Sequence, residues 1–192
     1  MNQPTQEQIS EVIDLISISI NDLINRDSDI FDIYIDTPQS FLPEENILNR
    51  ELHEITINHR LAVYLEKHIL ESETLNHYNI DIEYNRYYNN QKMLHIDGCN
   101  TSVRPDIIVH TRMIQNVGLQ HYLVIETKKK EITQHDINKI MDFIENENYN
   151  YLFGLTISYC GNLDFVLANL YFHNGTYTNN IEIKIPKVVR NQ

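Results

Sequence analysis

The spacing of apolar side chains predicts three helices. Residues 5–25 carry apolar side chains at steps of three and four, the pattern of an amphipathic helix. The same spacing predicts a second helix over 47–75, with His59 on its inner stripe as a hydrogen-bonded core histidine. A third helix is predicted over 133–147, and Thr133 has the residue type and position of its N-cap.

Short apolar runs bounded by polar residues predict the strands. The polar run 85–92 after the first of them is interpreted as a loop. The pair Asn174-Gly175 separates the last two and is typical of a type I′ hairpin turn. The helix at 133–147 is long enough to connect the strands before and after it in parallel. The predicted strands are 78–84, 104–110, 121–128, 151–159, 163–173 and 176–185.

The order of these elements predicts an α/β sandwich with a mixed central sheet flanked by helices. With 192 residues, the chain is expected to form a single domain, 1–192. Within it we expect an N-terminal helical extension over 1–45, a core over 47–159 and a C-terminal β-hairpin over 160–192.

Composition narrows the class of protein. Hydrophobic residues make up 42% of the chain and charged residues 22%, values typical of a globular protein and not of a disordered or fibrous one. No apolar run reaches the length of a membrane helix, and the N-terminus does not resemble a secretory signal. Cys99 and Cys160 are therefore expected to be reduced thiols in a cytoplasmic protein.

The formal charge of −12 constrains the expected partners. A surface with 15 basic and 27 acidic side chains is not suited to binding nucleic acid over its whole extent. A local basic strip, or a group of carboxylates that holds a cation, stays compatible with this charge.

Three charged residues stand inside or at the end of apolar strands. Asp106 follows Pro105 in one strand, and Glu126 and Lys128 end the next. Because side chains two apart on a strand share a face, Glu126 and Lys128 are expected to project together, with Thr127 on the opposite face. Antiparallel pairing of the two strands would bring Asp106 beside Glu126.

Two adjacent carboxylates and a lysine have a clear chemical use. Carboxylate oxygens bind Mg²⁺ or Mn²⁺, and a cation relieves the repulsion between the two negative charges. The metal lowers the pKa of a bound water and neutralises charge on a phosphate. A neighbouring ammonium stabilises the negative charge of the transition state.

Pro105-Asp106 followed by Glu126-Thr127-Lys128 resembles the PD-(D/E)xK signature of the restriction-endonuclease-like nuclease superfamily. The predicted order over 47–159 is also similar to the αβββαβ core of that superfamily. A group of small bacterial members resembles the chain more closely. The resemblance rests on Glu54 and His59, on EYNR at 83–86, on RPDIIVH at 104–110, and on LVIETKK at 123–129.

The resemblance implies a role for each matching residue. Asp106, Glu126 and the carbonyl of Thr127 would be metal ligands, and Lys128 the catalytic lysine. Glu54 would be the acidic residue that tunes the site or binds a second metal. Lys139 could contact a phosphate. Tyr84, Tyr87 and Tyr88 could stack on bases, although half-buried structural tyrosines are the more ordinary interpretation.

The expected function is therefore that of an Mg²⁺- or Mn²⁺-dependent phosphodiesterase, an endonuclease-like hydrolase that acts on nucleic acid, with DNA as the expected substrate. Two alternatives stay open. The fold could serve as a non-catalytic module that binds nucleic acid or protein. The chain could also be an acidic interaction subunit whose helix over 5–25 docks on a partner or forms a homodimer.

Overall fold

The computed structural model describes residues 2–27, 53–87, 90–96, 99–112, 119–162 and 164–187. Within these ranges the helices are α1 (Gln6–Arg26), α3 (Glu54–Glu71) and α4 (Gln134–Glu145). The strands there are β1 (Asn79–Ile82), β2 (Arg86–Tyr87), β3 (Asn90–Gln91), β4 (Met93–Ile96), β5 (Cys99–Ser102), β6 (Ile107–His110), β7 (His121–Lys128), β8 (Phe153–Ser158), β9 (Phe165–His173) and β10 (Thr178–Pro186). Part of the predicted N-terminal extension and the predicted start of the second helix, 47–52, lie outside the described residues.

A six-stranded sheet with the order β1-β6-β7-β8-β9-β10 forms the centre of the molecule. Strands β7 and β8 are parallel and are connected through α4, while the other neighbours in this sheet are antiparallel. The mixed α/β sheet predicted from the element order is confirmed. The C-terminal hairpin extends this sheet, because β9 pairs with β8.

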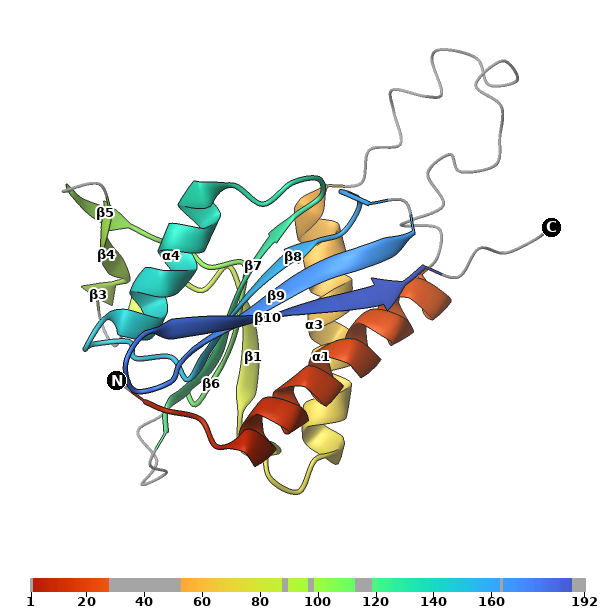
Figure 1. Cartoon of the computed structure of the whole chain (residues 1–192), viewed down its shortest axis with the longest axis horizontal. Coiled ribbons are helices and arrows are strands. Elements are labelled where there is room, and N and C mark those ends of the chain that lie inside the picture. Colours follow the sequence, from red (N-terminus) through yellow and green to blue (C-terminus); the bar gives the residue numbers. More distant parts are fainter. Residues whose placement is uncertain are drawn as a thin grey trace, which may run out of the picture.

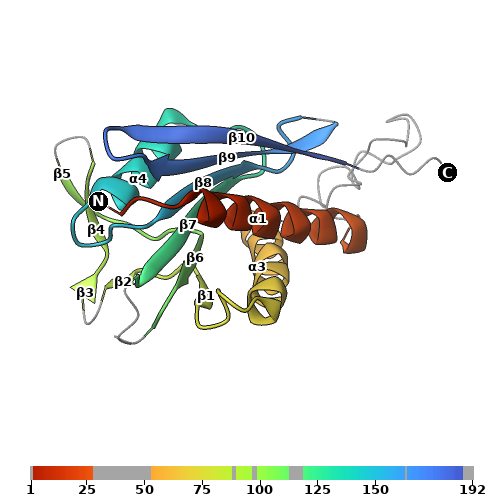
Figure 2. The ribbon, with the colours of Figure 1, turned by 60° about the horizontal axis from the view of Figure 1, so that its bottom comes forward.

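Helices cover both faces of the sheet, α1 and α3 on one side and α4 on the other (Figures 1 and 2). The alternation of β7 shows how its side chains divide: Leu123 and Ile125 pack with α1 and α3, whereas Val124 packs with α4. By the same alternation Glu126 and Lys128 lie on the α4 face, and Thr127 lies on the α3 face. The predicted division of the three motif residues between the faces is confirmed.

Helix α4 is held by a cap at one end and by close packing along its length. Thr133 and Asp136 form a reciprocal capping box, which confirms the predicted N-cap. Gly154 of β8 lies directly beneath Ile140 and Ile144 of α4, and a Cβ at this position would collide with Ile140. The absence of a side chain at Gly154 lets α4 approach the sheet closely.

The second helix differs from its prediction in both length and orientation. It ends at Glu71, four residues before the predicted boundary, and Ser72 is extended. His59 is exposed and is not a core residue, so this expectation was wrong. The helix has a second row of apolar residues, which includes Ile55 and Leu70 and is exposed. The prediction counted this row as part of the buried face. The buried residues are Ile57, Asn58, Leu61, Ala62, Tyr64, Leu65 and Ile69.

Two turns also differ from the prediction. The polar run 85–92 is not a plain loop, because β2 and β3 pair within it as a short antiparallel ladder. The last hairpin has a loop of four residues, 174–177, between the paired residues His173 and Thr178. Only Gly175 of this loop has a positive φ, so the expected type I′ turn, which needs two such residues, does not form.

No helix among the described residues has both the length and the apolar character that a membrane span requires.

Candidate active site

The carboxylates of the predicted motif come from adjacent ends of β6 and β7. The two strands are antiparallel, and Ile107 pairs with Ile125. This register places Asp106, which precedes Ile107, opposite Glu126, which follows Ile125. The register therefore makes the two residues neighbours across adjacent strands, as antiparallel pairing of these strands predicted.

Asp106 is held by the chain around it. Its Oδ2 accepts a hydrogen bond from the backbone N–H of Thr127 at 2.8 Å, and the Thr127 hydroxyl lies 3.0 Å from the same oxygen. The carbonyl of Asp106 accepts from the N–H of Glu83 at 2.9 Å, and Glu83 has a φ of 48°. A left-handed conformation is unusual for glutamate, so the backbone at Glu83 is strained where it binds the carbonyl of Asp106.

Thr127 connects α3 to the motif. Its hydroxyl lies 2.8 Å from Oδ1 of the buried Asn58 on α3, and that oxygen also accepts from the Tyr159 hydroxyl at 3.0 Å. Because the N–H of Thr127 points toward Asp106, its carbonyl points to the same side of the strand. The backbone oxygen that was predicted as a ligand thus faces the side on which Asp106 lies.

Glu126 is the most buried charged side chain of the site, with 3% of its side chain exposed. Lys139 of α4 places its Nζ 2.7 Å from Glu126 Oε1, and the same ammonium donates to the carbonyl of Arg104. The contact with Glu126 is a close ion pair and not a well-directed hydrogen bond, since Oε1 has no hydrogen-bond partner of good geometry. Burial raises the pKa of Glu126 to about 7; Lys139 opposes the rise and Asp106 adds to it.

Lys128 lies between two carboxylates from different helices. Its Nζ is 3.7 Å from Glu54 Oε1 at the start of α3 and 3.5 Å from Asp136 Oδ1 in the first turn of α4. Burial acts to lower the pKa of Lys128, but the charges of Glu54 and Asp136 outweigh it, so the pKa lies above its ordinary value. The side chain is therefore a positively charged ammonium at neutral pH and cannot act as a general base there.

Glu54 joins the site through two contacts. Besides its contact with Lys128, its Oε2 accepts from the backbone N–H of Lys129 at 2.9 Å. The carboxylate therefore ties the N-terminus of α3 to the end of β7. A carboxylate in the first turn of a helix is also favoured by the helix dipole.

The donor set fits a hard divalent cation. Asp106 and Glu126 supply carboxylate oxygens, Thr127 supplies a carbonyl, and water would complete an octahedral shell. The buried Glu126 Oε1, which lacks a well-directed hydrogen bond, is an oxygen that a cation would satisfy. The described residues contain no group of three or more His, Cys, Asp or Glu side chains placed to hold a metal. A metal site here would therefore need the carbonyl oxygen of Thr127 as its third protein ligand. Lys139 would have to move away from Glu126 Oε1.

Two residues of this arrangement were not predicted. Asn58 orients Thr127, and Asp136 pairs with Lys128. Asn58 is four residues after Glu54, so the two share one face of a helix, and that spacing could have indicated it.

The side chains of His59, Glu83 and Tyr84 make none of these contacts. His59 is exposed, and Glu83 pairs with Arg104 at 3.2 Å. Tyr84 is half-buried beside His110, with ring centroids 5.0 Å apart, which agrees with the more ordinary interpretation of a half-buried structural tyrosine. The side chain of Tyr87 and all of Tyr88 fall outside the described part of the chain.

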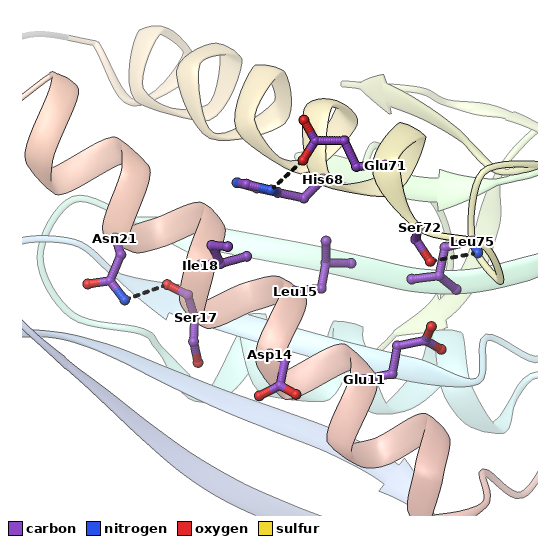
Figure 3. A pocket seen from close by; sticks show the side chains of 10 residues that line it. All are labelled: Glu11, Asp14, Leu15, Ser17, Ile18, Asn21, His68, Glu71, Ser72 and Leu75. Atoms are coloured by element: carbon purple, nitrogen blue, oxygen red, sulfur yellow. Dashed lines mark hydrogen bonds and ion pairs between the residues drawn. The ribbon is translucent and has the colours of Figure 1, made fainter.

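A groove of about 560 Å³ lies between α1 and α3, on the sheet face opposite to Glu126 and Lys128 (Figure 3). Glu11 and Asp14 of α1 and Glu71 of α3 place their carboxylates along it. Negative charge repels a phosphate backbone, so this groove is not a candidate for a nucleic-acid site.

The apolar stripe of the N-terminal helix α1 is largely buried within the chain. Its buried side chains pack with α3 and the sheet, and Ile18, 48% exposed, is the one large apolar residue of α1 that is exposed. The buried stripe is therefore not free for the docking or dimerisation that its periodicity suggested.

No protein-family model matches the chain, and neither a curated protein nor a solved structure is significantly similar to it.

Proposed function

We propose that the protein is a metal-dependent phosphodiesterase of the PD-(D/E)xK type that hydrolyses nucleic acid, with DNA as the expected substrate. The observation that carries the proposal is the position of Asp106 opposite Glu126, one residue beyond the paired Ile107 and Ile125, with Lys128 on the same sheet face as Glu126. The helices and central-sheet strands follow in the order α3, β1, β6, β7, α4, β8, with the short strands β2 to β5 inserted after β1, and this order supports the proposal because it is similar to the αβββαβ core that the sequence resembles.

Each residue has a role that follows from its surroundings. Asp106 is oriented in advance by the N–H of Thr127, so its carboxylate needs no reorganisation to bind a cation. Lys128 stays protonated because Glu54 and Asp136 flank it, and it can stabilise the negative charge that develops on a phosphate. A bound Mg²⁺ or Mn²⁺ would supply a Lewis acid and a water of lowered pKa.

A second candidate function is a non-catalytic binding module on the same fold. The specific observation in its favour is the ion pair of Lys139 with Glu126, because an internal ammonium can neutralise this carboxylate without any metal. The acidic surface also favours this alternative, since it slows the approach of a polyanion.

Cleavage assays on the purified full-length protein distinguish the two functions. Single- and double-stranded DNA and RNA are incubated with Mg²⁺ or Mn²⁺, and in parallel with a chelator. We expect cleavage that needs the metal and falls by roughly 100-fold or more in Asp106→Asn and in Lys128→Met. Lys67→Met is the matched control, because Lys67 pairs with Asp22 beside the opposite sheet face.

Cleavage at the wild-type rate by Asp106→Asn or Lys128→Met would show that the assignment is wrong. Absence of cleavage on all four substrates, together with a calorimetric Mn²⁺ signal that Glu126→Gln does not alter, would favour the binding module.

A further inference from the structure

A cavity of about 510 Å³ opens on the same sheet face as Glu126 and Lys128, on the flank of α4 that carries Ile137. Its floor begins one strand away from the motif, because Thr156 is the β8 neighbour of Glu126 and Ser158 is the neighbour of Lys128. Residues 131–132, three and four positions after Lys128, form one wall. The cavity and the candidate active site thus share a sheet face and a connecting segment.

The polar groups of this cavity suit a flat, neutral, hydrogen-bonding ligand. Asn169 of β9 is partly buried and lines the cavity. The buried hydroxyl of Thr156 lacks a partner of good geometry, although the Tyr171 hydroxyl is near it. A carboxamide offers both donors and an acceptor, which is the chemistry that reads the edge of a nucleobase.

Aromatic and basic side chains complete the lining. The rings of Phe165 and Tyr171 line the cavity and could contact the face of a base. Lys184 Nζ lies 5.5 Å above the centre of the Phe165 ring and 2.7 Å from Glu182 Oε1. Glu131 and Glu182 add negative charge to the lining, so the cavity is better suited to an uncharged base than to a phosphate.

We propose that this cavity binds one unstacked nucleobase of the strand whose phosphate lies at Asp106, Glu126 and Lys128. Strands in a sheet are about 4.8 Å apart, so the backbone of Asn169 lies about 10 Å from that of Glu126, a span that one nucleotide can bridge. A base that enters the cavity must be unpaired, so the substrate class is single-stranded nucleic acid or a frayed end. The inference rests on the proposed function for the position of the phosphate.

Binding to a cleavage-blocked protein tests this inference separately from catalysis. Full-length protein with Lys128→Met is titrated into a labelled single-stranded DNA 12-mer, and into a 12-mer of the same backbone with abasic sites, in Mg²⁺. We expect the normal strand to bind about tenfold or more tightly than the abasic one, as base contacts contribute on this scale. Adding Asn169→Ala or Phe165→Leu should reduce this preference several-fold, and adding Asn21→Ala on α1 should not.

The outcomes separate the two proposals. Equal affinity for normal and abasic strands, no binding of either strand, or an Asn169→Ala protein that behaves like Asn21→Ala would overturn the base-binding cavity. A preference lost in Asn169→Ala would support the cavity even if the wild-type protein cleaved nothing, in which case the catalytic proposal alone would fail. Far-UV circular dichroism and thermal unfolding of each variant verify that it is folded.

Discussion

The ammonium of Lys139 lies 2.7 Å from Oε1 of Glu126, and both side chains are largely buried. Lys139 therefore contacts the Glu126 oxygen that the cation of the proposed function would bind. The pair links α4 to the end of β7 and neutralises a carboxylate that would otherwise be a lone buried charge. The effect of burial on the pKa of Glu126 is larger than the opposing effect of Lys139, so this pKa rises to about 7.

Lys139→Ala should destabilise the protein mainly above neutral pH. The folded-state pKa of Glu126 lies above its ordinary value of 4.5, so this group lowers stability as pH rises from about 4.5 to 7. Without Lys139 the folded-state pKa rises further, and each added unit costs about 1.4 kcal/mol at higher pH. Urea unfolding should show a small difference from wild type at pH 5.5 and a difference of about 3 kcal/mol at pH 8.5.

Lys184→Ala is the control for that measurement. Lys184 and Glu182 have the same 2.7 Å separation, but each side chain is about half exposed. Removal of an exposed partner should change the free energy of unfolding by at most about 1 kcal/mol at either pH. Equal effects of the two substitutions at pH 8.5 would contradict the role given to burial.

Lys139→Met should strengthen Mn²⁺ binding. In the wild-type protein a cation must displace the ammonium from Glu126 Oε1, and methionine has a similar volume and no charge. Isothermal calorimetry should show affinity that increases several-fold in Lys139→Met and is lost in Glu126→Gln. Weaker Mn²⁺ binding by Lys139→Met would indicate that Lys139 supports the site instead of competing with the metal.

Lys92→Met should stabilise the protein at and below neutral pH. Lys92 is 1% exposed, lies among aromatic rings and donates to the Tyr151 hydroxyl at 2.8 Å. Burial lowers its pKa to about 7. Below pH 7 the buried side chain is charged in the folded protein, and this charge lowers the free energy of unfolding. The free energy of unfolding of the wild-type protein therefore rises between pH 7 and 10.5. Chemical unfolding should show a gain of roughly 1–4 kcal/mol at pH 6 that shrinks toward pH 10. A gain that does not change with pH would refute this explanation.

Asp81→Asn should destabilise the protein at neutral pH and lose this effect in acid. Burial opposes ionisation of Asp81, but hydrogen bonds from His110 and Arg112 outweigh it and lower the pKa to about 2. The stabilisation is present above pH 3.8 and disappears as pH falls to 2. The expected loss is roughly 2 kcal/mol at pH 7. Acid unfolding curves of the two proteins should converge near pH 2, and parallel curves would contradict the prediction.

Thr133→Ala should cost about 1 kcal/mol through loss of the α4 cap and should also disturb Lys128. The Thr133 hydroxyl donates to Asp136 Oδ2 at 2.7 Å, and the other oxygen of Asp136 lies near Lys128. NMR titration should therefore show a lower pKa for Lys128 in Thr133→Ala, with recovery in Thr133→Ser. Thr5→Ala removes the cap of α1 and should cost a similar free energy without affecting Lys128.

The strand part of the site could be predicted because it depends on local geometry. Alternation along β7 assigns Glu126 and Lys128 to one face, and a short antiparallel connection brings Asp106 beside Glu126. The helical part was predicted less well. Two apolar rows on α3 made His59 appear internal, whereas the row that contains Asn58 is the one that packs inward.

The sequence by itself determined the helices α1, α3 and α4, the six strands of the central sheet, their order and the face of β7 to which each motif residue belongs, because these follow from periods of two and 3.6 residues. Only the tertiary structure decided that Lys139 meets Glu126, that Asn58 meets Thr127 and that a cavity opens beside α4. Those contacts depend on where each helix crosses the sheet. The crossing is set by packing of side chains from distant segments, such as Ile140 over Gly154, and no local pattern specifies it.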